Sequence, residues 1–184
     1  MKKGVKIIEK ELEIPSGIDV VIGEGYFTVK GPKGELRRDF PSYVKASMKD
    51  GKVTFSVEGD RKKTSIAGTM KSHLSNMIHG VTHGYEGRMR FVHSHFPMKV
   101  SVDGKNLVVQ NFLGERSTRK IPCAGDIKMK VDKDEVIVTG IDKESVGQAI
   151  ANIEQKTKVR GFDRRVFQDG IYIIQKPVPS KEKS

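Results

Sequence analysis

The chain contains an internal repeat of about 80 residues, and this repeat limits the possible fold more than any other feature. Val29–Glu35 reads Val-Lys-Gly-Pro-Lys-Gly-Glu, and Val109–Glu115 reads Val-Gln-Asn-Phe-Leu-Gly-Glu, at an offset of 80. The openings of two helical patterns share this offset, whereas Val53 and Val136 are 83 apart, so the copies differ by small loop insertions. The repeat is too long for a solenoid unit and has the size of a small domain. We therefore expect a duplicated module, with the copies joined near residues 84–95.

Strand patterns precede a helical pattern in each copy. Alternating apolar residues between Gly- and Asp-containing turns predict strands at 18–22, 26–30, 36–40, 44–48 and 53–57, and again at 100–102, 107–110, 128–131, 136–139 and 171–174. Apolar residues at helical spacing predict helices over 64–80 and 142–154, with Gly80 ending the first and Asp142 capping the second. The methionines of the first helix are expected in its core face.

These patterns predict an α+β protein of two tandem duplicated domains, each an antiparallel β-sheet packed against one main helix. The expected domains are residues 1–84 and 85–176. Residues 2–13 are interpreted as a charged lead-in to the first strand. Residues 177–184 contain two prolines and alternating charge, so we expect a flexible tail.

The net charge of the chain favours a polyanionic partner. It has 34 Lys and Arg residues against 23 Asp and Glu, a net charge of +11 and a pI near 9.7. Nucleic acid is the first candidate and an anionic membrane surface the second. The single cysteine, Cys123, excludes an internal disulfide, and no signal peptide or membrane span is recognisable. We expect a soluble cytoplasmic protein.

The positive charge is densest at Gln155–Arg165, termed the basic segment below. Five of its 11 residues are Lys or Arg, and Gly161 would let the chain turn closely past a phosphate backbone. A solvated surface loop is the alternative interpretation. The segment Gly80–Arg90, taken as its first-copy equivalent, carries only +1 against +4, which favours a function specific to the second copy. The predicted RNA contacts are Lys156, Lys158, Arg160, Gly161, Arg164 and Arg165, with Lys33, Arg37, Arg38, Arg116, Arg119 and Lys120 as secondary candidates.

Three aromatic residues lie in or near the basic segment. Phe162, Phe167 and Tyr172 could stack on exposed bases, although core packing is the favoured interpretation for Phe167 and Tyr172.

No catalytic constellation is recognisable in the sequence. His93 and His95 could form a zinc site with His79 or His83, but no acidic or cysteine ligand stands at suitable spacing beside them. Turn packing or contact with a polyanion is favoured for these histidines. Cys123 has no neighbouring base and is expected to be a buried apolar residue. We predict no enzyme activity, no metal and no cofactor.

Three segments resemble the L-six family of large-subunit ribosomal proteins: Val29–Leu36, Ile66–Met77 and Val138–Ala149. The resemblance extends from about Ile14 to Tyr172 and includes the duplication. It implies binding of large-subunit rRNA mainly through the second domain, neighbouring ribosomal proteins as partners, and a position in the cytoplasmic ribosome near the sarcin–ricin loop and the landing site of the translational GTPases.

One departure from the bacterial form of the family points to the source. A Tyr-Lys-Gly-Lys-Gly run is replaced by Lys158–Arg165, which resembles the archaeal and eukaryotic branch, the latter being the L-nine form. The compact chain favours the archaeal type. An RNA-binding protein that works off the ribosome, or a small metal-dependent hydrolase using His93 and His95, are the alternatives.

Overall fold

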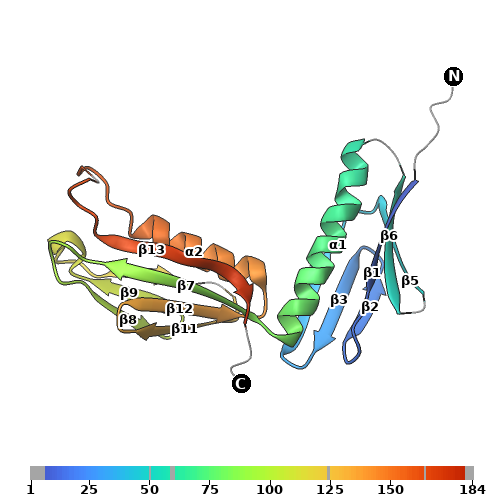
Figure 1. The fold of residues 1–184 in the computed structure, drawn as a ribbon, viewed down its shortest axis with the longest axis horizontal. Helices are drawn as coiled ribbons and strands as arrows, with labels where there is room; N and C mark the ends of the chain where they lie inside the picture. The colour runs from blue at the N-terminus through green and yellow to red at the C-terminus, as the bar shows by residue number, and fades with distance from the viewer. Residues whose placement is uncertain (1–6, 50, 59–60, 124, 164, 181–184) are drawn as a thin grey trace. The chain divides into compact units, whose positions relative to one another are not determined.

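The computed structural model describes residues 7–49, 51–58, 61–123, 125–163 and 165–180. The chain divides into two compact units, Met1–His83 and Gly84–Ser184, and each has its own hydrophobic core (Figure 1). Both units are α+β, with antiparallel sheets and one main helix, as the sequence predicts. Each unit has two small sheets rather than one.

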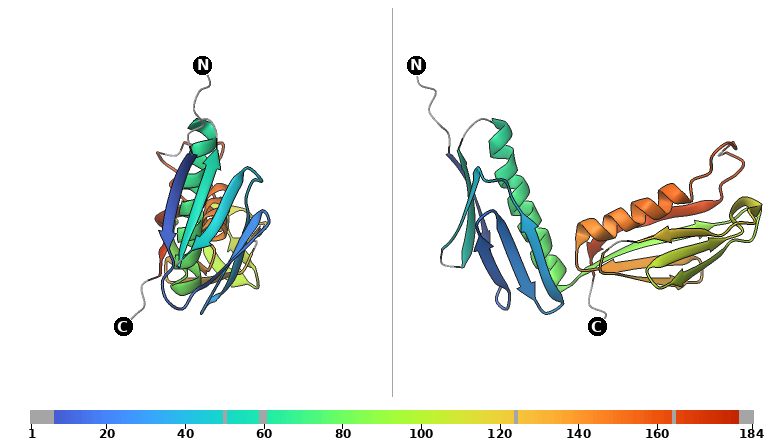
Figure 2. Two further views of the ribbon diagram at one scale, coloured as in Figure 1. Left: turned by 90° about the vertical axis from the view of Figure 1, so that its right-hand side faces the viewer. Right: turned by 180° about the vertical axis from the view of Figure 1, so that it is seen from behind.

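The first unit contains two three-stranded antiparallel sheets, β1-β6-β5 and β2-β3-β4, and α1 packs against both (Figure 2). Its elements are β1 (Ile7–Glu13), β2 (Asp19–Gly23), β3 (Tyr26–Gly31), β4 (Gly34–Asp39), β5 (Val44–Lys49), β6 (Lys52–Glu58) and α1 (Arg61–Thr82). The predicted strands of this copy are confirmed to within about two residues. Alternation in β6 buries Val53, Phe55 and Val57, and these face the stripe on α1 that includes Met70, Leu74 and Met77. The methionines are core residues, as predicted.

Two predictions for the first unit are wrong. Residues 7–13 form strand β1, which pairs with β6, rather than a lead-in without regular structure. Four of the seven residues of this strand are charged, so its sequence has no clear apolar alternation, and β6 supplies its hydrogen-bond partners. Helix α1 passes through Gly80, and the left-handed residue after its end is Gly84, with φ +73°.

The second unit contains the sheets β10-β9-β8 and β11-β12-β7-β13, also antiparallel, and α2 packs against both. Its elements are β7 (Tyr85–Val92), β8 (Lys99–Asp103), β9 (Asn106–Gln110), the 3-10 turn Phe112–Gly114, β10 (Arg119–Pro122), β11 (Ile127–Asp132), β12 (Glu135–Gly140), α2 (Lys143–Lys156) and β13 (Gly170–Pro179). Gly87 lies directly beneath α2, since an added Cβ would clash with Ile150 Cδ1.

The topology corrects the predicted junction between the copies. Strand β7 is no linker: it lies between β12 and β13 in the sheet and corresponds to β1 of the first unit. Gly80–Arg90 therefore consists of the end of α1 and most of β7, so it is not the equivalent of the basic segment. Only His83 and Gly84 separate α1 from β7, whereas residues 157–169 separate α2 from β13. The long basic loop is thus an addition of the second unit.

Strand β13 extends beyond the predicted domain end. Val178 pairs with Glu86 and Pro179 with Tyr85, so residues 177–179 do not belong to a tail. Two prolines are tolerated because β13 is the edge strand, and its pairing with β7 is irregular after Ile173. Ser180 donates from its backbone N–H to the Gly84 carbonyl at 2.9 Å, and residues 181–184 lie outside the described residues. Among the described helices, none has the length and apolar character needed to cross a membrane.

Candidate RNA interface

Helix α2 positions the basic segment at its carboxyl end. The helix begins after Asp142, whose carboxylate accepts hydrogen bonds from the backbone N–H groups of Glu144 and Ser145 at 3.3 and 2.9 Å. It ends at buried Thr157, whose hydroxyl donates to the Ile153 carbonyl at 2.9 Å and accepts from Ile171 N at 3.2 Å. The loop from 158 to 169 is therefore anchored at its base, where the helix end and β13 meet.

The residues after Thr157 alternate between core and solvent. Val159 is only 6% exposed and belongs to the hydrophobic core of the second unit, while Lys158 and Arg160 on either side are exposed. The two cations, two positions apart, lie in solvent on either side of the buried valine. Burial of one valine therefore directs two charges outward.

Gly161 then reverses the chain in a left-handed conformation with φ +78°. No atom lies within 4 Å of the position that a Cβ would occupy, so backbone conformation alone requires glycine here. The following turn closes on Asp163: its carboxylate accepts from Arg165 N at 2.9 Å, and its carbonyl accepts from Phe167 N at 2.9 Å. The one acidic residue of the basic segment is thus used to shape the loop.

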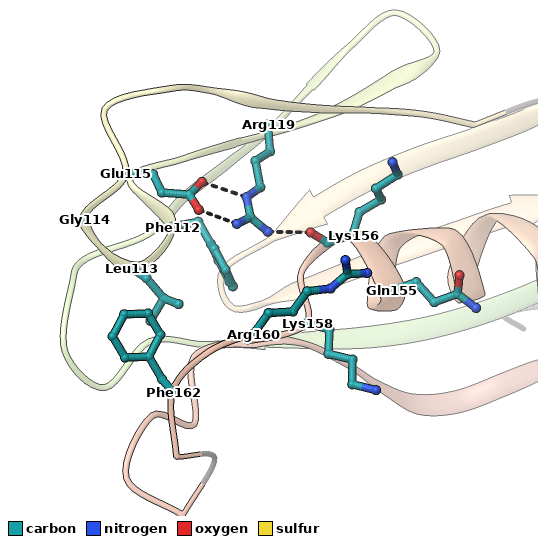
Figure 3. A pocket seen from close by; sticks show the side chains of 10 residues that line it. All are labelled: Phe112, Leu113, Gly114, Glu115, Arg119, Gln155, Lys156, Lys158, Arg160 and Phe162. Carbon is teal, nitrogen blue, oxygen red and sulfur yellow. Dashed lines mark hydrogen bonds and ion pairs between the residues drawn. The ribbon is translucent and has the colours of Figure 1, made fainter.

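These cations line a surface groove of about 520 Å³ beside the end of α2 (Figure 3). One wall comes from the turn after β9 and the other from the basic segment. The lining residues are Phe112, Leu113, Gly114, Glu115, Arg119, Gln155, Lys156, Lys158, Arg160 and Phe162. Four of them carry positive charge and one, Glu115, carries negative charge. The groove is therefore suited to an anion.

Arg119 holds the two walls together. Its Nε donates to Glu115 Oε2 at 2.8 Å, its Nη2 pairs with Glu115 Oε1, and its Nη1 donates to the Lys156 carbonyl at 2.6 Å (Figure 3). The guanidinium also lies 4.1 Å from the centre of the Phe112 ring. A hydrogen bond from Arg119 lowers the pKa of Glu115 despite partial burial. Arg119 is therefore a structural residue of the groove, with its guanidinium already engaged, and Glu115 adds little free negative charge.

The other predicted cations fall into three groups. Arg165 is exposed on the same loop but does not line the groove, and Arg164 lies outside the described residues. Arg116 and Lys120 are exposed near Arg119 in the chain and also stand outside the groove lining. The remaining three secondary candidates, Lys33, Arg37 and Arg38, belong to the first unit.

Lys33 and Arg37 have local interactions in the first unit. Lys33 donates from Nζ to the His83 carbonyl, and Arg37 lies 4.0 Å from the centre of the Tyr26 ring and 3.5 Å from Asp39.

Sequence reasoning did not include the turn at residues 111–115 in the RNA interface, although this turn forms the other wall of the groove. Asn111 and Leu113 both adopt left-handed backbone, with φ 57° and 53°, and Leu113 packs partly against the core of the unit. The repeat held a usable signal, because this turn aligns with the loop at Gly31–Gly34, where Lys33 N donates to the Val81 carbonyl near the end of α1. In both units the turn after the middle strand meets the carboxyl end of the helix.

Comparison with known proteins decides the family. The family model described as "Ribosomal protein L6" matches residues 14–84 and 96–170, one match in each unit. The chain belongs to this ribosomal protein L6 family. The prediction from the sequence is therefore confirmed, including the duplicated architecture.

Several archaeal members of the ribosomal protein L6 family resemble the chain along nearly its whole length. "Large ribosomal subunit protein uL6" of Methanosarcina mazei is 49% identical over 175 residues, covering 94% of this chain and 99% of the relative. The proteins of the same name from Methanothrix thermoacetophila and Methanobrevibacter smithii are 47% and 48% identical, over 94% and 92% of this chain and 99% and 96% of their own lengths. These relatives support the archaeal-type assignment.

The L6 family is structural rather than enzymatic, and the residues weighed for catalysis have other roles. Cys123 is buried in the core of the second unit, and burial raises the pKa of its thiol, as expected for an inert cysteine. His93 stacks on Phe91 with ring centres 6.4 Å apart. Across the part of the chain that the structure describes, no group of three or more metal-ligating side chains comes together.

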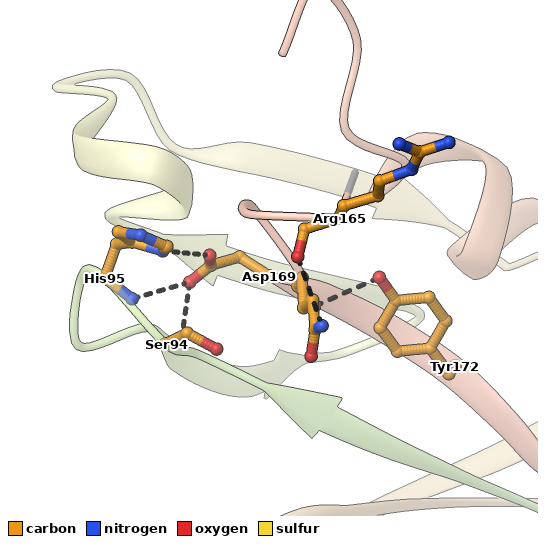
Figure 4. A network of polar contacts seen from close by, with 6 residues as sticks. Ser94, His95, Arg165, Asp169 and Tyr172 are labelled. Atoms are coloured by element: carbon orange, nitrogen blue, oxygen red, sulfur yellow. Dashed lines mark hydrogen bonds and ion pairs between the residues drawn. The ribbon is translucent and has the colours of Figure 1, made fainter. Parts of the chain in front are cut away.

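His95 has an acidic partner that its sequence neighbours do not reveal. Asp169, 2% exposed, accepts from Ser94 N at 2.9 Å and from His95 N at 3.3 Å, and its Oδ2 lies 3.2 Å from His95 Nδ1 (Figure 4). Burial by itself would raise the pKa of Asp169, but the backbone hydrogen bonds from His95 and Ser94 and the His95 ring hold it below its usual value. The pair closes the far end of the basic loop onto the segment after β7.

Core packing is the favoured prediction for Phe167 and Tyr172, and it is confirmed for only one of them. Phe167 is half-buried and stacks with His95, with ring centres 4.5 Å apart, so its predicted packing role is confirmed. Tyr172 is exposed on the edge strand and donates its hydroxyl to the Gln168 carbonyl at 3.0 Å, so core packing is wrong for Tyr172 (Figure 4). The alternation of β13 turns this ring outward, since its neighbours Ile171 and Ile173 face the core.

Proposed function

We propose that the chain is a structural constituent of the large ribosomal subunit that binds large-subunit rRNA through the groove of its second unit. The observation that carries this proposal is the convergence of Lys156, Lys158 and Arg160 on one groove in which Arg119 already neutralises the acidic residue. Phosphate groups are the ligands that such a set of cations attracts. The names of the archaeal relatives support the subunit.

The mechanism is electrostatic and geometric. Lys and Arg side chains contact phosphates and fix the orientation of the protein on folded RNA, while the shape of the groove selects the local path of the backbone. The left-handed backbone of Gly161 shapes the wall of the groove that the basic segment forms. Because the base of the loop is anchored by Thr157 and its end by Asp169, the cations are arranged before RNA arrives.

The family resemblance supports a finer location as part of this proposal. In the cytoplasmic ribosome, the second unit lies near the sarcin–ricin loop and the landing site of the translational GTPases, with other large-subunit proteins as neighbours.

The salt dependence of RNA binding tests the groove. Lys158→Ala combined with Arg160→Ala should reduce the slope of log affinity against log salt by about 1.5, since each phosphate contact contributes roughly 0.7–0.9. Lys128→Ala combined with Lys130→Ala is the matched control, because both lysines are exposed on β11 of the same unit and neither lines the groove. Equal slopes for the two double variants would show that charge acts diffusely and that the groove is not the contact site.

A further inference from the structure

We propose that Phe162 is a stacking platform for a single unpaired nucleobase of the bound RNA, placed beside the phosphate-binding cations. This inference rests on the proposed function and adds a base contact to it. Phe162 lines the groove together with Lys158 and Arg160, yet its side chain is 55% exposed (Figure 3). A large apolar ring exposed within a strongly charged groove is stabilised when an aromatic ligand covers it.

Phe162 is held in place by a run of rings. Its ring centre lies 4.9 Å from that of Phe167, tilted by 48°, and Phe167 in turn stacks on His95 at 4.5 Å. These separations fall in the range of favourable aromatic pairs. His95 is fixed from behind by the buried carboxylate of Asp169 (Figure 4). The run of rings leads from His95, whose ring is held by the buried Asp169, through the half-buried Phe167 and ends in the exposed Phe162.

The surroundings of Phe162 favour a nucleobase over an apolar protein side chain. The core of a protein–protein interface is depleted of charged residues, whereas four of the ten residues that line this groove are Lys or Arg. A base bound to a phosphate backbone satisfies both features, because the backbone takes the cations and the base takes the ring. Folded RNA offers such bases in loops and bulges, where they are not paired.

Affinity for deproteinised large-subunit rRNA gives the first test. Phe162→Ala should weaken binding of the full chain about tenfold, whereas Phe162→Tyr should keep most of the affinity, because base stacking needs an aromatic face. Phe162→Leu separates stacking from apolar bulk and should behave like Phe162→Ala. The matched control is Val166→Ala, since Val166 is an aliphatic residue of the same loop that is 57% exposed. Wild-type affinity for Phe162→Ala would overturn the proposal.

Fluorescence gives the second test, since the chain contains no tryptophan. In Phe162→Trp protein, the introduced indole should be quenched on addition of rRNA, as expected for an indole stacked on a base. Val21→Trp provides the reference, because Val21 is 52% exposed on β2 of the first unit. A blue shift without quenching in assembled subunits, absent with naked rRNA, would identify a protein partner and reject the nucleobase.

The two proposals fail differently. If wild-type protein does not bind rRNA in a salt-dependent manner, the proposed function is wrong. If wild-type binding and its salt slope are as expected while Phe162→Ala and Val166→Ala bind equally well, only the stacking platform is wrong.

Discussion

At the residue scale, Gly161 and Asp163 fix the conformation of the loop that carries the cations of the groove. Gly161 has a left-handed backbone and open space around it, so its role is conformational and not one of packing. Asp163 uses its carboxylate to close the turn after it. These two residues separate the effect of geometry from the effect of charge.

The first prediction uses this separation. Gly161→Val keeps the net charge but disfavours φ +78° by roughly 1–2 kcal/mol, so the turn should shift and RNA affinity should fall. Asp163→Asn removes a negative charge while keeping an acceptor oxygen, and it should have the smaller effect. Gly104→Val is the control, since Gly104 has φ +58° and equally open space in the β8–β9 hairpin. Binding titrations on variants whose circular dichroism is native check this prediction. Unchanged affinity for Gly161→Val would mean that the loop acts only as a flexible basic segment.

The second prediction concerns acid stability. Because the pKa of Asp169 is lowered in the folded protein, its carboxylate contributes stability above the unfolded pKa of about 4, and this contribution is lost as pH falls through the folded pKa. Asp169→Asn should therefore destabilise the protein at pH 7 and reduce the further loss of thermal stability between about pH 5 and pH 2. Asp126→Asn, at an exposed position of the same unit, is the control. Parallel melting-temperature curves for wild type and Asp169→Asn would contradict the assigned role.

At the level of elements, the two copies close the carboxyl end of their helix in different ways. Helix ends leave carbonyl groups without partners inside the helix. In the first unit Lys33 supplies both donors, from its backbone N to Val81 O at 3.0 Å and from Nζ to His83 O. In the second unit Arg119 donates to Lys156 O. In the second unit, where the Arg119 side chain makes this contact, a groove lies between the turn after β9 and the end of α2.

The third prediction follows from the position of Arg119. Arg119→Ala should destabilise the second unit by about 1–2 kcal/mol, at the lower end for charge-assisted hydrogen bonds because the Glu115 side chain is 36% exposed. Arg116→Ala, at an exposed neighbouring position, should change stability by less than about 0.5 kcal/mol. Urea unfolding followed by circular dichroism measures both. If the two variants unfold alike, Arg119 does not join the walls of the groove.

For the whole molecule, the boundary between the units decides which fragments can fold. Each unit has a separate core, and β7 is an interior strand of the second unit's larger sheet. A fragment that begins inside β7 loses the pairing of both β12 and β13.

The fourth prediction compares three fragments. Residues 84–184 should fold cooperatively and bind large-subunit rRNA, residues 1–83 should fold and bind much more weakly, and residues 91–176 should not fold. Thermal melts followed by circular dichroism, with RNA titrations of the folded fragments, provide the measurement. Equal affinities for the first two would refute the division of labour between the copies. A cooperative melt for residues 91–176 would show that β7 is dispensable.

Local patterns in the sequence determined most of the regular structure. The helical stripe of α1, the Asp142 cap and the alternating strands depend on residues a few positions apart, so they can be recognised without the fold. The repeat indicated the duplication, and charge density located the basic segment. Strands β1 and β7 escaped recognition because charged residues interrupt their apolar pattern and strands distant in the chain supply their pairing.

The tertiary structure alone decided which residues make the groove. Arg119 meets Lys156 across 37 positions and His95 meets Asp169 across 74, and no spacing rule connects residues so far apart in the chain. Packing therefore decides which of the predicted cations line the groove. Lys156, Lys158 and Arg160 line it, and Arg119 joins its two walls. Arg165 is exposed on the same loop but does not line the groove. The physical reason is that composition determines how much charge the chain carries, whereas burial of residues such as Val159 and Thr157 determines where that charge points.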